Sequence, residues 1–280
     1  MRNHVDYFEN LDATVKAALD EDIGSGDITA ELIDENNISS ATVITRDNAV
    51  VCGRPWVDKV FSLVDAEVEI TWLVDEGDPV AKGTQLFTVQ GATRSLLTCE
   101  RTALNFLQTL SATATETRRL TELVAHTGVK LLDTRKTIPG LRLAQKYSVR
   151  TGGGHNHRIG LFDAFLVKEN HIAASGSISE AVRRARKLSP DARLEIEVED
   201  IDQLRLALDS QPDWIMLDNF TVADVATAVK EANQAITLEA SGGIEKDHDL
   251  IKIAETGVDC ISIGALTKHC RAIDLSMLLD

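Results

Sequence analysis

One apolar run shows the pattern that repeats through the second half of this chain: Trp214-Ile215-Met216-Leu217-Asp218-Asn219. Its four apolar residues fit a short buried strand, and the polar pair Asp218-Asn219 marks the end of that strand. A helix-like stretch follows at 222–231. A strand followed by a helix is one βα unit, so the run predicts a parallel strand whose carboxyl end carries polar side chains.

Five further runs have the same character. They occupy 130–132, 164–167, 194–198, 236–238 and 260–263, and helix-like stretches at 179–188, 201–208 and 249–255 alternate with them. The starts of the runs are roughly 20 to 34 residues apart, which is typical of parallel strands joined by right-handed helical crossovers. The spacing therefore predicts an α/β barrel or a doubly wound sheet.

Polar side chains follow every one of these runs. The ends of six consecutive strands converge only when the strands form a ring, whereas an open sheet brings together mainly the loops beside its switch point. This favours the barrel. The polar residues at the strand ends are Asp133, Arg135, Lys136, Lys168, Glu169, Asn170, His171, Glu197, Glu199, Asp218, Asn219, Glu239, Ser241 and Ser262.

The first part of the chain has a different pattern. A helix is predicted at 5–19, short β-rich runs lie at 41–45, 50–52, 68–74 and 85–89, and a long helix runs from a proposed N-cap at Ser95 to His126. These patterns predict one domain at 1–112 and a second at 113–269, with the tail at 270–280 packing on the first.

Arg101 has an unusual expected position within the long helix. It is four residues after Leu97 and three before Leu104, so the spacing places it on the apolar stripe. An arginine there requires an anionic partner or a polar interface, because burying an unpaired charge is costly. A side chain that reaches water from the edge of the stripe is the alternative.

The chain as a whole is acidic. It has 44 Asp and Glu residues against 29 Lys and Arg, a net charge of −15, and this excludes general nucleic-acid binding, which needs a basic face. No stretch approaches the roughly 18 apolar residues of a membrane helix, and the chain start lacks a basic, apolar signal sequence. We expect a cytoplasmic protein without nucleic-acid or membrane partners. The cysteines Cys52, Cys99, Cys260 and Cys270 contain no CxxC pair and are expected to be reduced thiols.

The window 130–171 reverses this charge. It holds eight basic and three acidic residues, a net charge of +5, which predicts a local site for anionic small molecules. A solvated helix face is the better interpretation for Arg142, Lys146 and Arg150. Ligand contacts are expected of Arg135 and Arg158, which suit carboxylates, and of Lys136 and Lys168, which suit phosphates.

Two histidines and three glutamates add to this prediction. His155 and His157 have the spacing of metal ligands, but no third ligand follows nearby, so donation to an anion is favoured. Glu195, Glu197 and Glu199 alternate along one strand and share a face. With Asp218 they are candidates for ribose hydroxyls or for Mg²⁺ bound through water. Glu195 alone is expected to pair with a neighbouring Arg or Lys instead.

Two small-residue turns predict a phosphate site. Leu238-Glu239-Ala240-Ser241-Gly242-Gly243-Ile244 is a strand end followed by a turn whose backbone N–H groups can bind an anion. The next strand ends in Ser262-Ile263-Gly264, a second close backbone approach. On α/β barrels, phosphates commonly bind after the last strands.

Six ordered motifs carry a resemblance to a known family, and they extend over nearly the whole chain. The chain resembles the quinolinate phosphoribosyltransferases, the carboxylating nicotinate-nucleotide pyrophosphorylases. It departs from the usual pattern at Lys268-His269-Cys270, where the family has His then Ser. The motifs are Glu100-Arg101-Thr102-Ala103-Leu104-Asn105, Asp133-Thr134-Arg135-Lys136-Thr137, Gly152-Gly153-Gly154-His155-Asn156-His157-Arg158, Leu166-Val167-Lys168-Glu169-Asn170-His171, Met216-Leu217-Asp218-Asn219 and Glu239-Ala240-Ser241-Gly242-Gly243-Ile244.

The resemblance implies an N-terminal α/β sandwich domain and a seven-stranded TIM-like α/β barrel. It implies transfer of phosphoribosyl from phosphoribosyl pyrophosphate to quinolinate, with Mg²⁺, giving nicotinate mononucleotide, pyrophosphate and CO2 in NAD biosynthesis. A homodimer, or a hexamer, is implied, in which Arg101 is donated across the interface. The implied catalytic residues are Lys136, Lys168, Glu197 and Asp218, with Mg²⁺ near the last two. The implied substrate-binding residues are Arg101, Thr134, Arg135, Lys136, His157, Arg158, Lys168, Glu197, Asp218, Ser241, Gly242, Gly243, Ser262, Ile263 and Gly264.

Two alternatives remain at the level of sequence. A paralogous phosphoribosyltransferase of the molybdenum-transport type would have the same fold but another acceptor. A non-catalytic barrel that senses phosphate would keep the turns at 241–243 and 262–264, but it would not need the acids Glu197 and Asp218 beside a cationic cluster.

Overall fold

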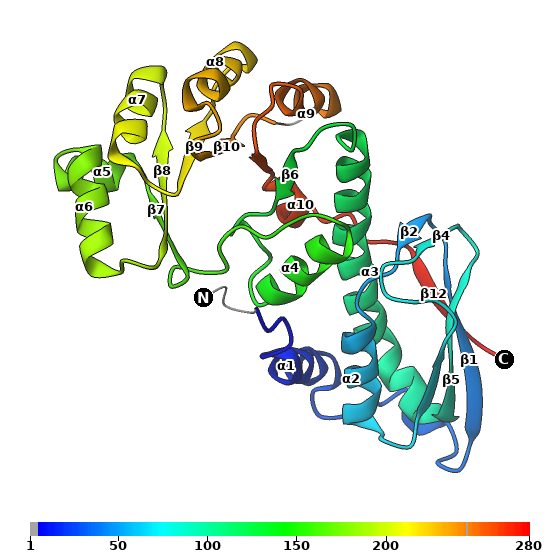
Figure 1. Ribbon diagram of the computed structural model, residues 1–280. Coiled ribbons are helices and arrows are strands. Elements are labelled where there is room, and N and C mark those ends of the chain that lie inside the picture. Colours follow the sequence, from blue (N-terminus) through cyan, green and yellow to red (C-terminus); the bar gives the residue numbers. More distant parts are fainter. Residues whose placement is uncertain (1–4, 245) are drawn as a thin grey trace. The chain divides into compact units, whose positions relative to one another are not determined.

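The computed structural model of the chain describes residues 5–244 and 246–280 and separates them into two units, each with its own sheet (Figure 1). The first unit comprises the chain up to Arg118 together with 137–153 and 266–280, and the second comprises 119–136 and 154–265. Parts of the segment expected to form the barrel, 137–153 and 266–269, thus pack with the first unit.

The sheet of the first unit is antiparallel, with the strand order β12-β1-β5-β3. Ala41, Val43 and Thr45 of β1 are buried because alternate side chains of a strand face the same side. The last strand of the chain pairs along the first, with Leu279 opposite Ala41. The strands are β1 (Ile38–Thr45), β2 (Ala49–Val50), β3 (Glu69–Trp72), β4 (Pro79–Val80), β5 (Gln85–Ala92) and β12 (Leu275–Leu279), and β2 pairs with β4.

Helices cover one face of this sheet (Figure 1). Trp56 and Phe61 of the second helix, Phe87 of β5, and Leu104 and Leu107 of the third helix form the centre of the core, each at most 1% exposed. Each fully buried side chain of this size contributes roughly 1.5–3 kcal/mol through the hydrophobic effect. The helices are α1 (Leu11–Ile23), the 3-10 helix η1 (Ala30–Leu32), α2 (Arg54–Val64), α3 (Thr93–Leu123) and α4 (Arg142–Thr151).

Two helix starts differ from the sequence-based expectation. The first helix begins at Leu11 rather than at residue 5. The long helix begins at Thr93, so Ser95 lies inside it and is not its N-cap. The Ser95 hydroxyl donates instead to Asp65 Oδ2 at 2.7 Å, a contact between segments that the local sequence does not reveal.

Arg101 does not lie on the apolar stripe of α3. Its side chain is 57% exposed and lies 3.4 Å from Glu100. The buried stripe runs through Leu96, Ala103 and Leu107. At about 100° per residue, these three positions lie on the side of the helix opposite Arg101. The structure therefore agrees with the alternative in which the Arg101 side chain reaches water, and not with a place on the buried stripe.

The second unit contains six parallel strands in the order β6-β11-β10-β9-β8-β7. All six predicted strands are present, and their ends differ from the prediction by at most three residues. They are β6 (Lys130–Leu132), β7 (Ala164–Val167), β8 (Arg193–Val198), β9 (Trp214–Asp218), β10 (Thr237–Ser241) and β11 (Cys260–Ser262).

A seventh segment extends this sheet beside β6. His155 forms a parallel bridge with Leu132, and its N–H donates to Leu131 O at 2.8 Å. β6 and β7 are the two outer strands of the six-stranded order, and the segment at His155 pairs with the free side of β6. The α/β class and the parallel β/α architecture inferred from the sequence are confirmed.

Helices cover the outer face of the parallel sheet (Figure 1). Three of them begin with a side-chain N-cap, since Ser177, Asp200 and Thr221 each accept a hydrogen bond from the backbone N–H three residues later. The helices are α5 (Glu169–Ser175), α6 (Ile178–Leu188), α7 (Ile201–Ser210), α8 (Val222–Ala232) and α9 (Asp247–Ala254). The short helix α10 (Ala265–Lys268) follows β11 and lies almost wholly in the first unit.

The side chain of Lys146 contradicts another expectation. It is 0% exposed in α4, although a solvated helix face was predicted for it. The four cysteines are free thiols, and burial raises the pKa of Cys99 and of Cys260 to about 12. Among the described helices, none combines the length and apolar character needed to cross a membrane.

Candidate active site

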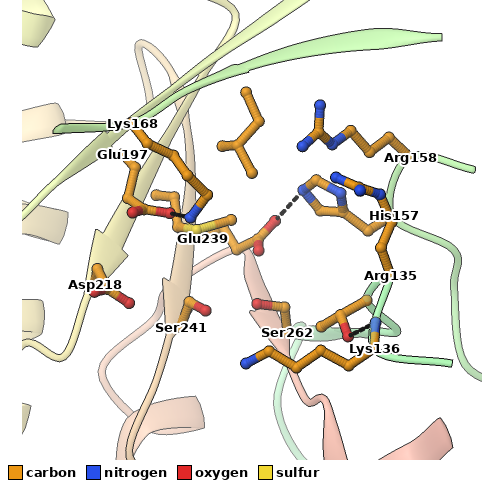
Figure 2. A pocket seen from close by; sticks show the side chains of 13 residues that line it. Arg135, Lys136, His157, Arg158, Lys168, Glu197, Asp218, Glu239, Ser241 and Ser262 are labelled. Atoms are coloured by element: carbon orange, nitrogen blue, oxygen red, sulfur yellow. Dashed lines mark hydrogen bonds and ion pairs between the residues drawn. The ribbon is translucent and has the colours of Figure 1, made fainter. Parts of the chain in front are cut away.

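The carboxyl ends of the parallel strands enclose a cavity of about 350 Å³ (Figure 2). A volume of this size suits a small molecule. Ten residues that the sequence placed in the site line it together, which confirms that strand ends far apart in sequence meet here. The lining residues are Thr134, Arg135, Lys136, His157, Arg158, Leu166, Lys168, Glu197, Met216, Asp218, Glu239, Ser241 and Ser262.

Side chains along a strand alternate between its two faces, and this alternation explains which of them reach the cavity. Glu195 and Glu197 of β8 point inward, while Leu194, Ile196 and Val198 pack on the other face and are 0% exposed. On β9 and β10, Met216 pairs in register with Glu239, and Asp218 with Ser241. Side chains two residues apart on each strand therefore form the lower and upper wall of the cavity.

Cations gather on one side of the cavity. Arg135, Lys136, His157 and Arg158 lie there, opposite Lys168 and Asp218 (Figure 2). Burial, and then the like charge of Arg135, lower the pKa of the Arg158 guanidinium. Two positively charged arginines that repel each other favour the binding of an anion between them.

Asp133 fixes the segment that carries His157. Its side chain is 0% exposed; Oδ1 accepts the N–H of His157 at 3.0 Å, and Oδ2 accepts a hydrogen bond from Asn156 Nδ2. A carboxylate that accepts several hydrogen bonds holds a loop in place more firmly than a neutral acceptor. Asp133 thus acts on the pocket through the backbone at 156–157 and does not line it.

A lysine and an acid form the second side of the cavity. Lys168 Nζ donates to Glu197 Oε2, and the Glu197 side chain is 7% exposed. Burial raises the pKa of Glu197, and the Lys168 contact only partly offsets this. Asp218 lies beside them and accepts a hydrogen bond from Asn219 Nδ2 at 2.9 Å.

A buried cluster forms the floor of the cavity. His157 Nε2 lies 2.8 Å from Glu195 Oε2 and 3.3 Å from Glu239 Oε2, and both glutamate side chains are 0% exposed. The expectation that Glu195 pairs with an arginine or lysine was wrong, because its position on the inner face of β8 directs it at His157. The third acid, Glu199, lies beyond the strand and is exposed.

The two small-residue turns follow β10 and β11. Gly242 has φ +86°, and a Cβ there would lie 2.2 Å from Asn219 Oδ1, so the turn requires glycine. Asn219 N–H donates to Ser241 O at 2.8 Å, and Ile263 N–H donates to Leu132 O at 2.9 Å. Ser241 and Ser262 line the cavity, whereas Gly242, Gly243, Ile263 and Gly264 are not among its lining residues.

Sequence reasoning missed the lining residues Leu166 and Met216, and it placed Glu239 among the polar strand ends without giving it a role. Each lies two residues before a predicted polar strand end, at Lys168, Asp218 and Ser241. The period of two along each strand was the signal that could have found them. Arg101 belongs to the first unit and is absent from the residues that line this cavity.

Such a fold and pocket define a class of α/β proteins that act on anionic small molecules at the carboxyl ends of their strands. Residues 27–111 match the family described as "Quinolinate phosphoribosyl transferase, N-terminal domain", and residues 113–278 match the family described as the C-terminal domain of the same enzyme. The chain belongs to the quinolinate phosphoribosyltransferase family.

Individual relatives are similar over almost their whole length. A Synechocystis protein named probable nicotinate-nucleotide pyrophosphorylase (carboxylating) is 40% identical over 271 residues, 95% of this chain and 92% of its own. The Mycobacterium leprae nicotinate-nucleotide pyrophosphorylase (carboxylating) is 39% identical, over 96% of this chain and 97% of its own. The solved structure of the Francisella tularensis nicotinate-nucleotide pyrophosphorylase is 47% identical, with a TM-score of 0.95 and coverage of 99% of this chain and 98% of that one.

Proposed function

We propose that this chain transfers phosphoribosyl from phosphoribosyl pyrophosphate to quinolinate, with decarboxylation, and so forms nicotinate mononucleotide, pyrophosphate and CO2 for NAD biosynthesis. The observation that carries the proposal is one cavity with arginines and a histidine on one side and a lysine with two acids on the other. A substrate pair with carboxylates at one end and phosphates at the other matches this division.

Quinolinate is assigned to the side with Arg135, His157 and Arg158. Planar guanidinium groups bind carboxylates through two parallel hydrogen bonds, and two such groups suit two carboxylates. Thr134 shapes the start of this side, because its hydroxyl accepts the N–H of Lys136 at 3.0 Å. The acceptor is thereby held with its ring nitrogen toward the centre of the cavity.

Phosphoribosyl pyrophosphate is assigned to the opposite side and to the turns beyond it. Glu197 and Asp218 would accept hydrogen bonds from the ribose hydroxyls. Ser241, Gly242, Gly243, Ser262, Ile263 and Gly264 would hold the 5-phosphate through backbone N–H groups and hydroxyls. Binding energy from this remote phosphate aligns the sugar for attack.

The donor set of the cavity also fits Mg²⁺. Glu197 and Asp218 offer carboxylate oxygens, which are the ligand atoms this ion prefers, and Mg²⁺ commonly keeps its waters and binds substrate phosphates. When bound, Mg²⁺ would neutralise charge on the pyrophosphate. Glu197 and Asp218 are the residues that would hold it, through water.

The chain's own cations stabilise the leaving group. As the ring nitrogen bonds to the anomeric carbon, the bond from that carbon to pyrophosphate breaks and negative charge grows on the leaving oxygen. Lys136 and Lys168 lie where they can stabilise that charge, and Glu197 holds Lys168 in position. The positive charge on the ring nitrogen then stabilises the carbanion that loss of CO2 leaves on the adjacent carbon, and a proton that adds to this carbon completes the product.

We propose in addition that the chain acts as a homodimer in which Arg101 of one copy completes the quinolinate site of the other. Support comes from its position on α3, where the side chain is 57% exposed and its close partner is the neighbouring Glu100. An exposed guanidinium of this kind is available to a second copy, and it would bring a third arginine to a dianionic substrate.

The experiment is a direct assay of the purified chain. Protein is incubated with quinolinate, phosphoribosyl pyrophosphate and Mg²⁺, and nicotinate mononucleotide is measured by mass spectrometry. We expect product that requires all three components. Binding without product would support the phosphate-sensing alternative, and product only with a different aromatic acceptor would support the molybdenum-transport-type alternative.

A further inference from the structure

The buried cluster of His157, Glu195 and Glu239 brings two carboxylates together away from water, and their negative charge needs a positive partner. Glu195 Oε1 and Glu239 Oε1 accept no hydrogen bond from any residue that the structure describes, while Glu239 Oε2 lies 3.3 Å from His157 Nε2. An uncompensated carboxylate in such a place costs several kcal/mol. A neutral imidazole compensates no charge, whereas an imidazolium whose Nε2–H faces both carboxylates does.

Burial also makes the charged form of a carboxylate in this cluster less favourable. Burial first, and then the nearby Glu239, raise the pKa of Glu195. The like charge of the neighbouring Glu239 adds to the cost of ionising Glu195. His157, 2.8 Å from Glu195 and 3.3 Å from Glu239, is the group in hydrogen-bond contact that can balance negative charge in this cluster.

The surroundings of His157 are mixed in charge. Trp214 of β9 meets the ring edge to face at a centroid distance of 6.4 Å and adds no charge. Burial alone would lower the pKa of His157, but the hydrogen bonds to Glu195 and Glu239 outweigh it and raise the pKa to about 9. The charged and titratable groups around the cluster are Asp133 after β6, Glu195 and Arg193 of β8, Glu239 of β10, Cys260 of β11, and Arg135 and Arg158.

We propose that Glu195 and Glu239 are positioning residues that keep His157 protonated, so that the ring stays a charged hydrogen-bond donor to the carboxylate-bearing acceptor. The identity of that acceptor rests on the proposed function, whereas the charge of His157 does not. Glu239 lines the cavity and Glu195 lies outside the lining, and both act through the ring that they hold.

A metal ion is the competing use of this cluster. The ligand atoms of the three residues lie within 4.8 Å of one another, and one histidine with two carboxylates suits a divalent transition metal. A metal bound at Nε2 would replace the proton there, so the two uses exclude each other.

The first test reads the charge directly. Histidine ring nitrogens of the full-length chain are followed by NMR between pH 6 and pH 10.5, and a His157→Gln variant assigns the signal among the seven histidines. We expect His157 to stay doubly protonated at pH 7.5 and to titrate near pH 9. A neutral ring at pH 7.5, or stoichiometric Zn²⁺ binding that shifts only this signal, would overturn the proposal.

The second test uses Glu195→Gln and Glu239→Gln, which keep shape and remove charge. Each variant should lower the His157 titration midpoint by about one unit or more. KM for quinolinate should rise roughly tenfold or more, the effect of losing one charge-assisted hydrogen bond, with a much smaller change in KM for phosphoribosyl pyrophosphate. Glu239→Asp, which keeps the charge, should restore most of the affinity.

The chain offers a matched control on its surface. His126 Nε2 lies 3.3 Å from Glu255 Oε1, the same distance as in the His157–Glu239 pair, but both side chains are more than half exposed. Glu255→Gln should change neither KM. Unchanged His157 titration and unchanged KM in folded Glu195→Gln and Glu239→Gln proteins would contradict the inference. If wild type makes no nicotinate mononucleotide, the proposed function fails, and the ring titration still decides the charge of His157.

Discussion

At the scale of single residues, Lys168 has the most specific predicted effect. Lys168→Ala removes the cation that is expected to stabilise the leaving pyrophosphate, and it leaves Glu197, 7% exposed, without that partner. We expect kcat/KM to fall at least about a hundredfold, as for loss of a preorganised electrostatic group. Steady-state kinetics with circular dichroism as a check of folding measure this.

Lys187→Ala is the control at the same scale, because Lys187 is an exposed cation on α6 outside the cavity. Its kinetics should match those of wild type. Equal losses in both variants would show that the general positive charge of the unit, rather than the position of Lys168, supports the reaction.

At the scale of elements, the turn after β10 is the feature most sensitive to a single methyl group. Gly242→Ala would place a Cβ 2.2 Å from Asn219 Oδ1 at a φ of +86°. The turn must move, so we expect KM for phosphoribosyl pyrophosphate to rise roughly tenfold while KM for quinolinate changes little.

Gly83→Ala separates this steric effect from backbone strain. Gly83 has φ +90°, close to that of Gly242, and nothing lies within 4 Å of its Cβ position. This variant should lose about 1 kcal/mol of stability and keep both KM values. An unchanged KM for phosphoribosyl pyrophosphate in Gly242→Ala would remove the turn from the phosphate site.

At the scale of the whole molecule, the shared site predicts complementation. Arg101→Ala and Lys168→Ala homodimers should both be nearly inactive, each for a different reason. After subunit exchange, a mixed dimer has one site with both residues intact, so equal mixing should restore about one quarter of wild-type activity. Exchange, verified by mass spectrometry, without any recovery would place Arg101 outside the site.

The sequence by itself determined the order and type of the elements and most of the cavity. Six strands and their polar ends followed from short apolar runs and turn residues, because these signals are local. The positions of Arg135, Arg158, Lys168 and Asp218 in one cavity followed from the convergence of parallel strand ends.

Only the tertiary structure decided which side chains face one another. Spacing placed Arg101 on the apolar stripe of α3 and Lys146 on a solvated face, and the fold reversed both. The pairing of His157 with Glu195 and Glu239 joins a loop residue to two strand positions that are far apart in sequence. A residue's charge state and burial depend on neighbours brought together by packing, and periodicity along one element carries no information about them.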